Sequence, residues 1–279
     1  MPEIEFINHK NVKSLKLGKK FSSIDYSLIN NFSELQNINA KTTNIDTIEE
    51  EIFSHHKSLS CFEFPNALKD IKFSSFRGCN KIKEIDLRNT QTSAIGNKAF
   101  EECSSVNRIS FSDTIETIGE EAFNKCISLE NVKISSTSKL KISNYAFRYC
   151  TNLKAIEISS VDTQLGMNAF HRCYNLLNCT LKNVSKIGSN CFEHCHRLND
   201  ISIYFDNVLN IEDEAFANCY KLKNIHFISK SKESKIILGK RAFENCKSLK
   251  IVEISCSELQ VEDDTFVGCS SLETVKFLT

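Results

Sequence analysis

One pattern of apolar residues recurs along the chain. Its most regular part is the segment Ala-Phe-x-x-Cys, followed by aliphatic residues three, six and eight positions after the Cys, as in Leu153, Ile156 and Ile158. A further aliphatic residue stands five positions before each Phe, and Gly often follows it, as in Ile118-Gly119. The close copies are Ala99–Cys103, Ala122–Cys126, Ala146–Cys150, Ala169–Cys173, Ala215–Cys219 and Ala242–Cys246.

The same frame covers the whole chain. Twelve positions are equivalent to the Phe, from Phe6 to Phe266, so the mean spacing is 23.6 residues. Residues 1–60 contain degenerate copies in which His9, Phe32 and His56 replace the Cys, whereas residues 61–279 contain regular copies. A period of this length is typical of a solenoid, in which each unit buries its apolar side only against its neighbours. We therefore predict a single domain, residues 1–279, of about 12 units of 23–24 residues.

The spacing within one unit predicts its local structure. The paired aliphatics separated by one residue, such as Ile156 and Ile158, alternate as in a short strand, and equivalent strands would stack into a parallel sheet. The Ala-Phe-x-x-Cys-x-x-Leu part has apolar residues three and four apart, which predicts a short helical turn on the opposite side. We expect Gly to suit the bend before that segment. The predicted fold is an α/β leucine-rich-repeat solenoid with a parallel concave β-sheet and short helical turns on its convex side.

The repeat also resembles a known family. The motif Ile-Gly-x-x-Ala-Phe-x-x-Cys-x-x-Leu-x-x-Ile-x-Leu is similar to the BspA-like, treponemal-type class of leucine-rich repeats, most closely from Ile71 onward. Copies of that class often carry a Pro shortly after the strand, and here only Pro65 stands there. The resemblance implies a protein that attaches to host or matrix proteins or acts in contacts at the cell surface.

The cysteines follow the repeat rather than a disulfide framework. The chain has 13 of them, an odd number. Nine share one slot of the repeat: Cys79, Cys103, Cys126, Cys150, Cys173, Cys195, Cys219, Cys246 and Cys269. Parallel side chains in successive units are poorly oriented for bridging. We expect a ladder of reduced, buried thiols that act as small hydrophobes and weak donors to neighbouring carbonyl groups.

One group of residues resembles a zinc site when it is taken out of the repeat frame: His171, Cys173, Cys179, Cys191, His194, Cys195 and His196. In the frame, Cys173 and Cys195 belong to the ladder, Cys179 and Cys191 replace core residues, and the histidines fall on variable outer positions. We therefore expect no metal, no cofactor and no catalytic residues. A metal-dependent enzyme that uses this Cys/His group is kept as a distant alternative.

Charge and hydropathy narrow the classes of function. The 35 basic residues balance the 35 acidic ones, which argues against a nucleic-acid partner, and no apolar run is long enough to span a membrane. The first ten residues do not resemble a secretory signal. The missing signal and the expected reduced thiols favour the cytoplasm and an intracellular scaffold, whereas the family resemblance favours the cell surface. Localisation therefore stays open.

Residues that alternate with the core aliphatics would face outward on the predicted sheet and change from unit to unit. Such a surface fits a non-catalytic solenoid that binds a protein or glycoconjugate. The candidate partner-binding residues are Glu157, Thr180, Ser202, Tyr204, His226, Ile228 and Glu253. Near them, Ser229–Lys235 coincides with the longest repeat spacing, which predicts an extruded loop. The last unit has no polar cap, which predicts either end-to-end self-association or a longer natural chain.

Overall fold

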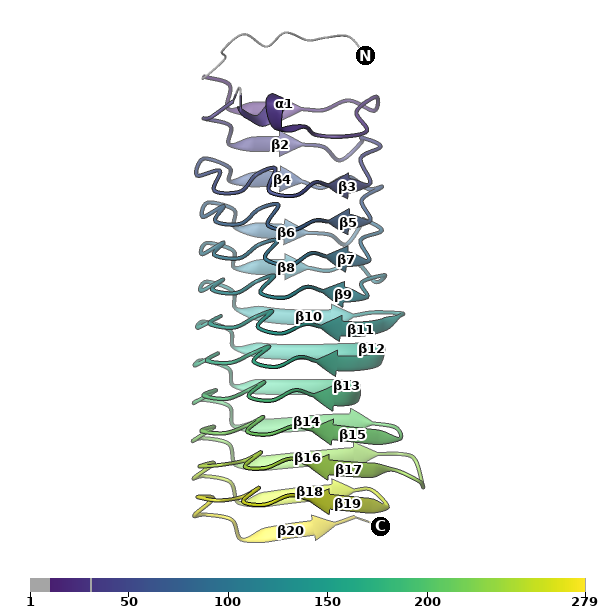
Figure 1. Ribbon diagram of the computed structural model, residues 1–279, viewed down its shortest axis with the longest axis vertical. Coiled ribbons are helices and arrows are strands. Elements are labelled where there is room, and N and C mark those ends of the chain that lie inside the picture. The colour runs from purple at the N-terminus through teal and green to yellow at the C-terminus, as the bar shows by residue number, and fades with distance from the viewer. Residues whose placement is uncertain (1–10, 31, 279) are drawn as a thin grey trace.

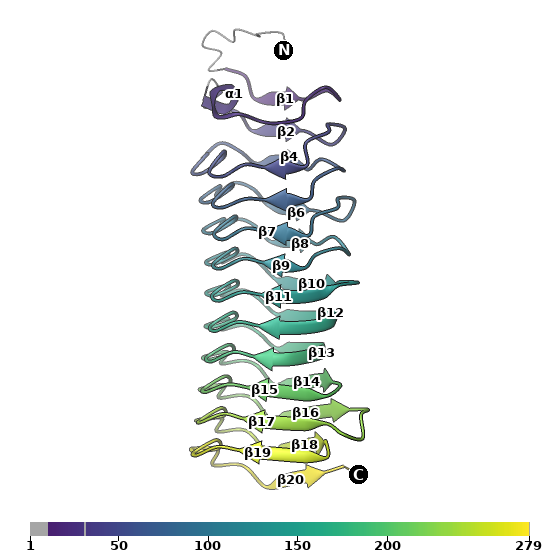
Figure 2. The same cartoon turned by 45° about the vertical axis from the view of Figure 1, so that its right-hand side comes forward.

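The computed structural model describes residues 11–30 and 32–278, so the expectations for Phe6 and His9 lie outside the described residues. Successive repeats form rungs of one column, with β1 and β20 toward its opposite ends (Figure 1). The column runs straight in the two ribbon views (Figures 1 and 2). The sheet that we expected to be concave therefore lies along the side of a straight column.

Two sets of parallel strands line the column, here called sheet A and sheet B. Sheet A comes from the Leu-x-x-Ile-x-Leu part of the repeat. Its strands are β1 (Ser14–Lys16), β2 (Asn37–Asn39), β4 (Cys61–Glu63), β6 (Glu84–Asp86), β8 (Arg108–Ser110), β10 (Asn131–Ser135), β14 (Asp200–Phe205), β16 (Asn224–Ser229), β18 (Ile251–Ser255) and β20 (Thr274–Phe277). The buried positions alternate with outward ones, as in β14, because successive side chains of a strand point to opposite faces.

Sheet B comes from the aliphatic residue five positions before the Phe. Its strands are β3 (Thr47–Ile48), β5 (Asp70–Ile71), β7 (Ala94–Ile95), β9 (Thr117–Ile118), β11 (Lys139–Ile142), β15 (Val208–Ile211), β17 (Lys235–Leu238) and β19 (Glu258–Val261). Two long strands, β12 (Ala155–Leu165) and β13 (Asn178–Ile187), run through both sheets and join them at mid-column. The sequence pattern predicted sheet A but not this second ladder.

The expected helical turns are wrong. The only helix in the described part of the chain is α1 (Tyr26–Asn30), and the Ala-Phe-x-x-Cys segments are tight non-helical turns. The residues two before and two after the Phe take positive φ, for example 58° at Lys98 and 61° at Glu102. Such residues cannot continue a right-handed helix. The Phe100 N–H instead donates to the Ala122 carbonyl of the next rung, at 2.8 Å.

The phenylalanine slot forms a continuous stack through the core. From Phe53 to Phe266, successive ring centroids lie 5.0–5.3 Å apart with interplanar angles of 1–19°. The rings from Phe53 to Phe243 are fully buried. Each ring thus contacts the rings above and below it, which is how a repeat that cannot bury its own apolar side becomes stable in an array.

The glycine of the repeat has a different role from the one we expected. At Gly119, φ lies outside the left-handed region, but an added Cβ would lie 2.6 Å from the backbone of Gly96 and Asn97 in the preceding rung. Gly96, Gly166, Gly188 and Gly239 are equally crowded. The residue is therefore needed for the close approach of two rungs rather than for a bend.

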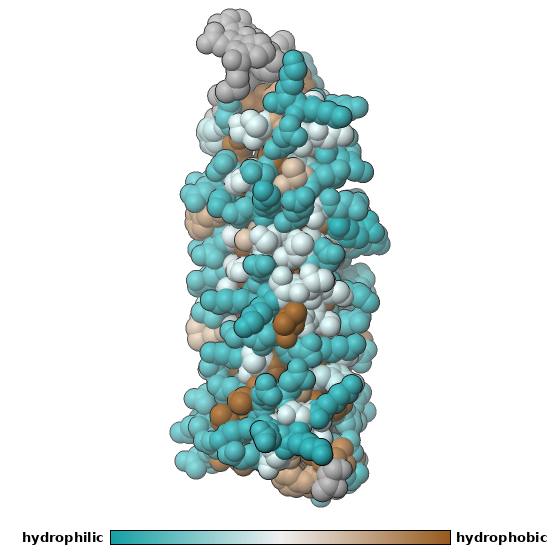
Figure 3. All heavy atoms as spheres, turned by 90° about the vertical axis from the view of Figure 1, so that its right-hand side faces the viewer, coloured by the Kyte–Doolittle hydropathy of each residue, from teal (hydrophilic) through white to brown (hydrophobic). Residues whose placement is uncertain are grey.

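The two remaining edges of the column differ in character. The turn edge contains the Ala-Phe-x-x-Cys turns, and the connecting edge carries the links from sheet A to sheet B. The connecting edge is largely hydrophilic, with isolated apolar side chains (Figure 3).

At the C-terminal end, β20 pairs with β18, and Phe277 is 59% exposed.

Candidate functional site

The strand register brings the seven candidate residues together on the outer face of sheet A. Glu157 pairs with Thr180, and Thr180 with Ser202. Ser202 in turn pairs with His226, and His226 with Glu253. Tyr204 and Ile228 pair in a second outward column beside this one. All seven are exposed or half-buried and alternate with buried core residues, so the column expected from the sequence exists as a continuous surface. Their role in binding stays a prediction.

Ion pairs between neighbouring rungs order this surface. His226 Nδ1 lies 2.8 Å from Glu253 Oε2, and Lys276 Nζ lies 3.5 Å from the other oxygen of the same carboxylate. The hydrogen bond with His226 is the main cause that lowers the pKa of Glu253. Higher in the column, Lys133 Nζ lies 2.9 Å from Glu157 Oε2. The face therefore carries two groups of paired charges, separated by the uncharged Thr180 and Ser202.

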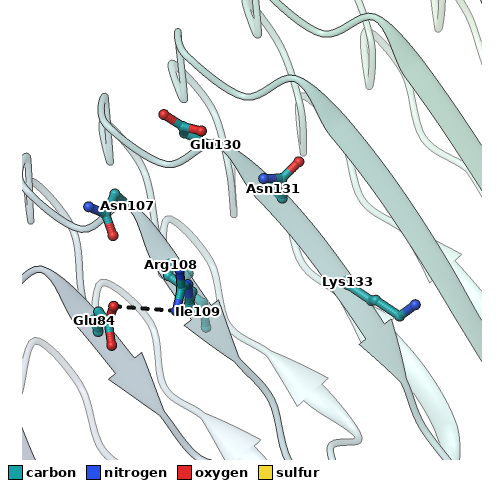
Figure 4. Close-up of a pocket in the computed structure, with 7 residues that line it drawn as sticks. All are labelled: Glu84, Asn107, Arg108, Ile109, Glu130, Asn131 and Lys133. Carbon is teal, nitrogen blue, oxygen red and sulfur yellow. Dashed lines mark ion pairs between the residues drawn. The ribbon is translucent and has the colours of Figure 1, made fainter.

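Sequence reasoning missed two interruptions in sheet A. Among the described strands, β4 pairs with β2, β6 with β8, and β10 with β12, so the ladder is broken between β4 and β6 and again between β8 and β10. A shallow polar hollow lies at the second break, between β8 and β10 (Figure 4). The residues that line it are Glu84, Asn107, Arg108, Ile109, Glu130, Asn131 and Lys133. No signal in the repeat marks either break, because the inward residues keep the pattern there.

The thiol ladder is confirmed. Each of the nine ladder thiols lies 3.0–3.4 Å from the carbonyl oxygen of the Phe in the preceding rung, toward which it donates. In the degenerate part, His56 stands in the Cys slot, and its Nε2 lies 3.4 Å from the carbonyl oxygen of Phe32, which fills the same slot of the preceding rung. All 13 cysteines are free. Burial raises the pKa of the ladder thiols, to about 12 at Cys79, so these groups are poor nucleophiles.

The group that resembled a zinc site is divided between the core and the turn edge. The thiols of Cys173 and Cys195 face carbonyl groups inside the column, and Cys179 and Cys191 are buried. The histidines gather on the turn edge around Glu193, which lies 3.2 Å from His171 and 3.1 Å from His194. The part of the chain that the structure describes contains no set of three or more His, Cys, Asp or Glu side chains placed to hold a metal ion. Within the described residues, the candidate zinc ligands are therefore not brought together.

The segment Ser229–Lys235 links β16 to β17 and extends beyond its neighbours at the connecting edge, as expected of an inserted loop (Figure 1). It is held at its base, where Ser229 Oγ donates to the Asp206 carbonyl at 3.0 Å. Within it, Ser234 is buried and donates to the Ser231 carbonyl. Across residues 11–30 and 32–278, no helix is long and apolar enough to cross a membrane.

These features define the class of protein: a parallel β-solenoid of leucine-rich repeats, with one Phe and one thiol stacked in each rung from Phe76/Cys79 to Phe266/Cys269. The model of the BspA type Leucine rich repeat region matches residues 2–94, 74–199 and 185–279. The chain therefore belongs to the BspA-type leucine-rich-repeat family.

Solved structures share the fold at low sequence identity. A leucine-rich repeat protein from Bacteroides ovatus is 18% identical, with a TM-score of 0.51 over 96% of this chain and 92% of that one. A chain of the Toll–Spatzle complex of Drosophila is 15% identical, with a TM-score of 0.53 over 91% of this chain and 34% of that one. No curated protein matches the sequence.

Proposed function

We propose that this protein is a non-catalytic binding solenoid that recognises a protein or glycoconjugate through the outer face of sheet A. The observation that carries the proposal is the contrast between the two sides of each strand. Inward positions hold buried apolar residues, mostly Ile, Val and Leu, whereas the outward column changes from Glu157 to Thr180, Ser202 and His226. A surface that varies along a rigid ladder can match one partner and reject others.

The strongest anchor on this face is the pair Tyr204 and Ile228. Both are half-buried in neighbouring strands and lie beside the His226–Glu253 ion pair. Tyrosine is enriched among the residues that dominate binding energy at interfaces, because its ring gives a large contact area and its hydroxyl a hydrogen bond. We therefore assign the centre of the contact to these four residues.

The setting that we propose is adhesion or another contact at the cell surface. Membership of the BspA-type family supports a binding role. A solved structure that shares the fold comes from the Toll–Spatzle complex, so a chain with this fold takes part in an assembly elsewhere. An intracellular scaffold is the second candidate, favoured by the 13 free thiols. Antibody staining of intact and permeabilised cells separates the two settings.

The binding face can be tested with a photo-crosslinking amino acid at position 180 of sheet A and, as a control, at position 127 of the turn edge. We expect one partner to crosslink from position 180 and not from position 127. The double variant Tyr204→Ala/His226→Ala should weaken binding of that partner at least about tenfold, as expected for hot-spot residues. Equal crosslinking from both positions, or unchanged affinity of the double variant, would contradict the proposal.

A further inference from the structure

The arginines divide into two groups. The chain has seven, and four of them are paired with acidic residues: Arg77, Arg88, Arg108 and Arg241. The other three, Arg148, Arg172 and Arg197, have no carboxylate within ion-pairing distance among the described residues. They lie on three successive rungs of the turn edge. An electrically neutral molecule thus concentrates its unpaired guanidinium groups in one place.

A tyrosine holds two of these groups in position. The guanidinium carbon of Arg148 lies 4.6 Å from the centroid of the Tyr149 ring, and its Nη2 is 3.4 Å from the phenol oxygen. From the next rung, Arg172 Nη1 donates to the same oxygen at 3.2 Å. The Nε atoms of both arginines are buried without a hydrogen-bond acceptor in the described part of the chain. Both cations are therefore fixed by an aromatic ring while their hydrogen-bonding capacity stays incompletely used.

The third arginine extends this surface along the column. Arg197 is exposed and bonds to Asn175 Oδ1 at 3.2 Å. Beside it, the His196 ring lies 5.1 Å from the Tyr174 ring and 5.0 Å from the Tyr220 ring, measured between centroids. The acidic residue that contacts this histidine group is Glu193, and its carboxylate is already paired with His171 and His194. The surface is therefore cationic and framed by aromatic rings.

We propose that this surface, the arginine edge (Arg148, Tyr149, Arg172, His196 and Arg197), binds an acidic segment of a protein partner. The planar guanidinium fork matches the two oxygens of an Asp or Glu carboxylate, and a charge-assisted bidentate pair is among the stronger polar contacts. Arginine and tyrosine together are also typical of protein–protein hot spots. The zero net charge of the chain disfavours a nucleic acid as the occupant. The arginine edge is separate from sheet A, so the proposal does not depend on the function proposed above.

The histidines add a pH dependence to this binding. His194 faces Glu193, His171, His196 and Arg172, and His196 faces Arg172, His194 and the rings of Tyr174 and Tyr220. Burial lowers the pKa of both, and nearby Arg172 lowers it further, whereas Glu193 opposes this lowering at His194. A bound carboxylate favours their protonated forms and itself stays ionised above about pH 5. Binding should therefore strengthen as the pH falls from 7.5 to 5.5.

The test measures fluorescence anisotropy of a labelled 12-residue peptide of alternating Glu and Ser against the full chain. A Gln/Ser peptide of equal length is the neutral control. The variants are Arg148→Gln/Arg172→Gln/Arg197→Gln and the charge-matched Arg88→Gln/Arg108→Gln/Arg241→Gln, each with its melting temperature. If the first variant fails to fold, the single substitution Arg197→Glu, at an exposed position, still tests the proposal.

We expect the acidic peptide to bind, more weakly at high salt, with an affinity at least about tenfold lower in the first variant and within about twofold of the unsubstituted chain in the matched one. Arg197→Glu should weaken binding without a change in melting temperature. Equal loss in both triple variants, or equal binding of the neutral peptide, overturns the proposal. A heparin fragment or single-stranded oligonucleotide that binds tightly while the acidic peptide does not would also overturn the assignment to an acidic protein segment.

Discussion

At the scale of single residues, the phenylalanine slot carries packing that the outward slots do not. Phe147 is fully buried, with ring centroids 5.1 Å from those of both Phe123 and Phe170. Replacing it by Ala removes both contacts and leaves a cavity, so Phe147→Ala should lower the free energy of unfolding by about 3–5 kcal/mol. Glu157→Ala, on the exposed side of sheet A, should stay within about 0.5 kcal/mol of the unsubstituted chain. Urea denaturation checks both, and equal midpoints would contradict the orientation of the strand.

The ladder thiols give a second prediction at this scale. Because burial raises the pKa of these thiols above the ordinary value of 9.0, the unfolded chain releases protons near pH 9 that the folded chain keeps. The contribution of the thiols to stability should therefore be constant below about pH 8 and fall as the pH rises above 9, by about 1.4 kcal/mol per pH unit for each thiol.

Thermal or urea unfolding at pH 7, 8, 9 and 10 measures this slope. The variant Cys150→Ala serves as the control. Because it has one ladder thiol fewer, its stability should fall less steeply with pH. In mass spectrometry after iodoacetamide treatment of the native chain, exposed Cys61 should be modified before the ladder thiols. Rapid modification of Cys126 or Cys150 without denaturant would show that the ladder thiols are accessible to solvent and would contradict their burial.

At the scale of elements, the sequence predicts the strands of sheet A well and the turns badly. The outward column from Glu157 to Glu253 follows directly from an alternation of period two, so its register could be read in advance. The turns misled us because Ala, Phe and Cys are buried at spacings that a helix would also produce. Positions with positive φ would have revealed the turns. Gly78, Gly268, Asn168 and Asn218 are residue types that favour positive φ, but Lys98 and Glu102, which also adopt it, are not. The arginine edge was missed because its residues fall on variable positions of those turns.

The repeat glycines give the prediction at this scale. In Gly119→Ala, the new methyl group would lie 2.6 Å from the backbone of the preceding rung, so the two rungs must separate. We expect a loss of about 1–3 kcal/mol, typical of overpacking. Gly18→Ala is the matched control, since nothing lies within 4 Å of the added atom. Calorimetric melting of both variants decides the matter, and equal melting temperatures would mean that the rungs are not in close contact at Gly119.

At the scale of the whole molecule, self-association through strand β20 stays a prediction, supported by the apolar side chains that this strand exposes. Strand β20 exposes Val275 and Phe277 at 43% and 59%, at an edge where another strand can add. Sedimentation velocity should show larger species as the concentration rises. The change Phe277→Lys should reduce them, whereas Val161→Lys, at a 58% exposed position far from this end, should not. Identical sedimentation of the two variants would exclude the terminal rung as the contact.

The most direct test of the stacked column measures distances along it. Spin labels carried by a non-natural amino acid at positions 63 and 157, 63 and 202, and 63 and 276 lie four, six and nine rungs apart. With rungs about 4.8 Å apart, pulsed electron resonance should give label separations near 19, 29 and 43 Å, in proportion to the number of rungs. Separations that do not grow with the rung count, or a 63–276 pair closer than the 63–157 pair, would contradict the solenoid on which both proposed surfaces depend.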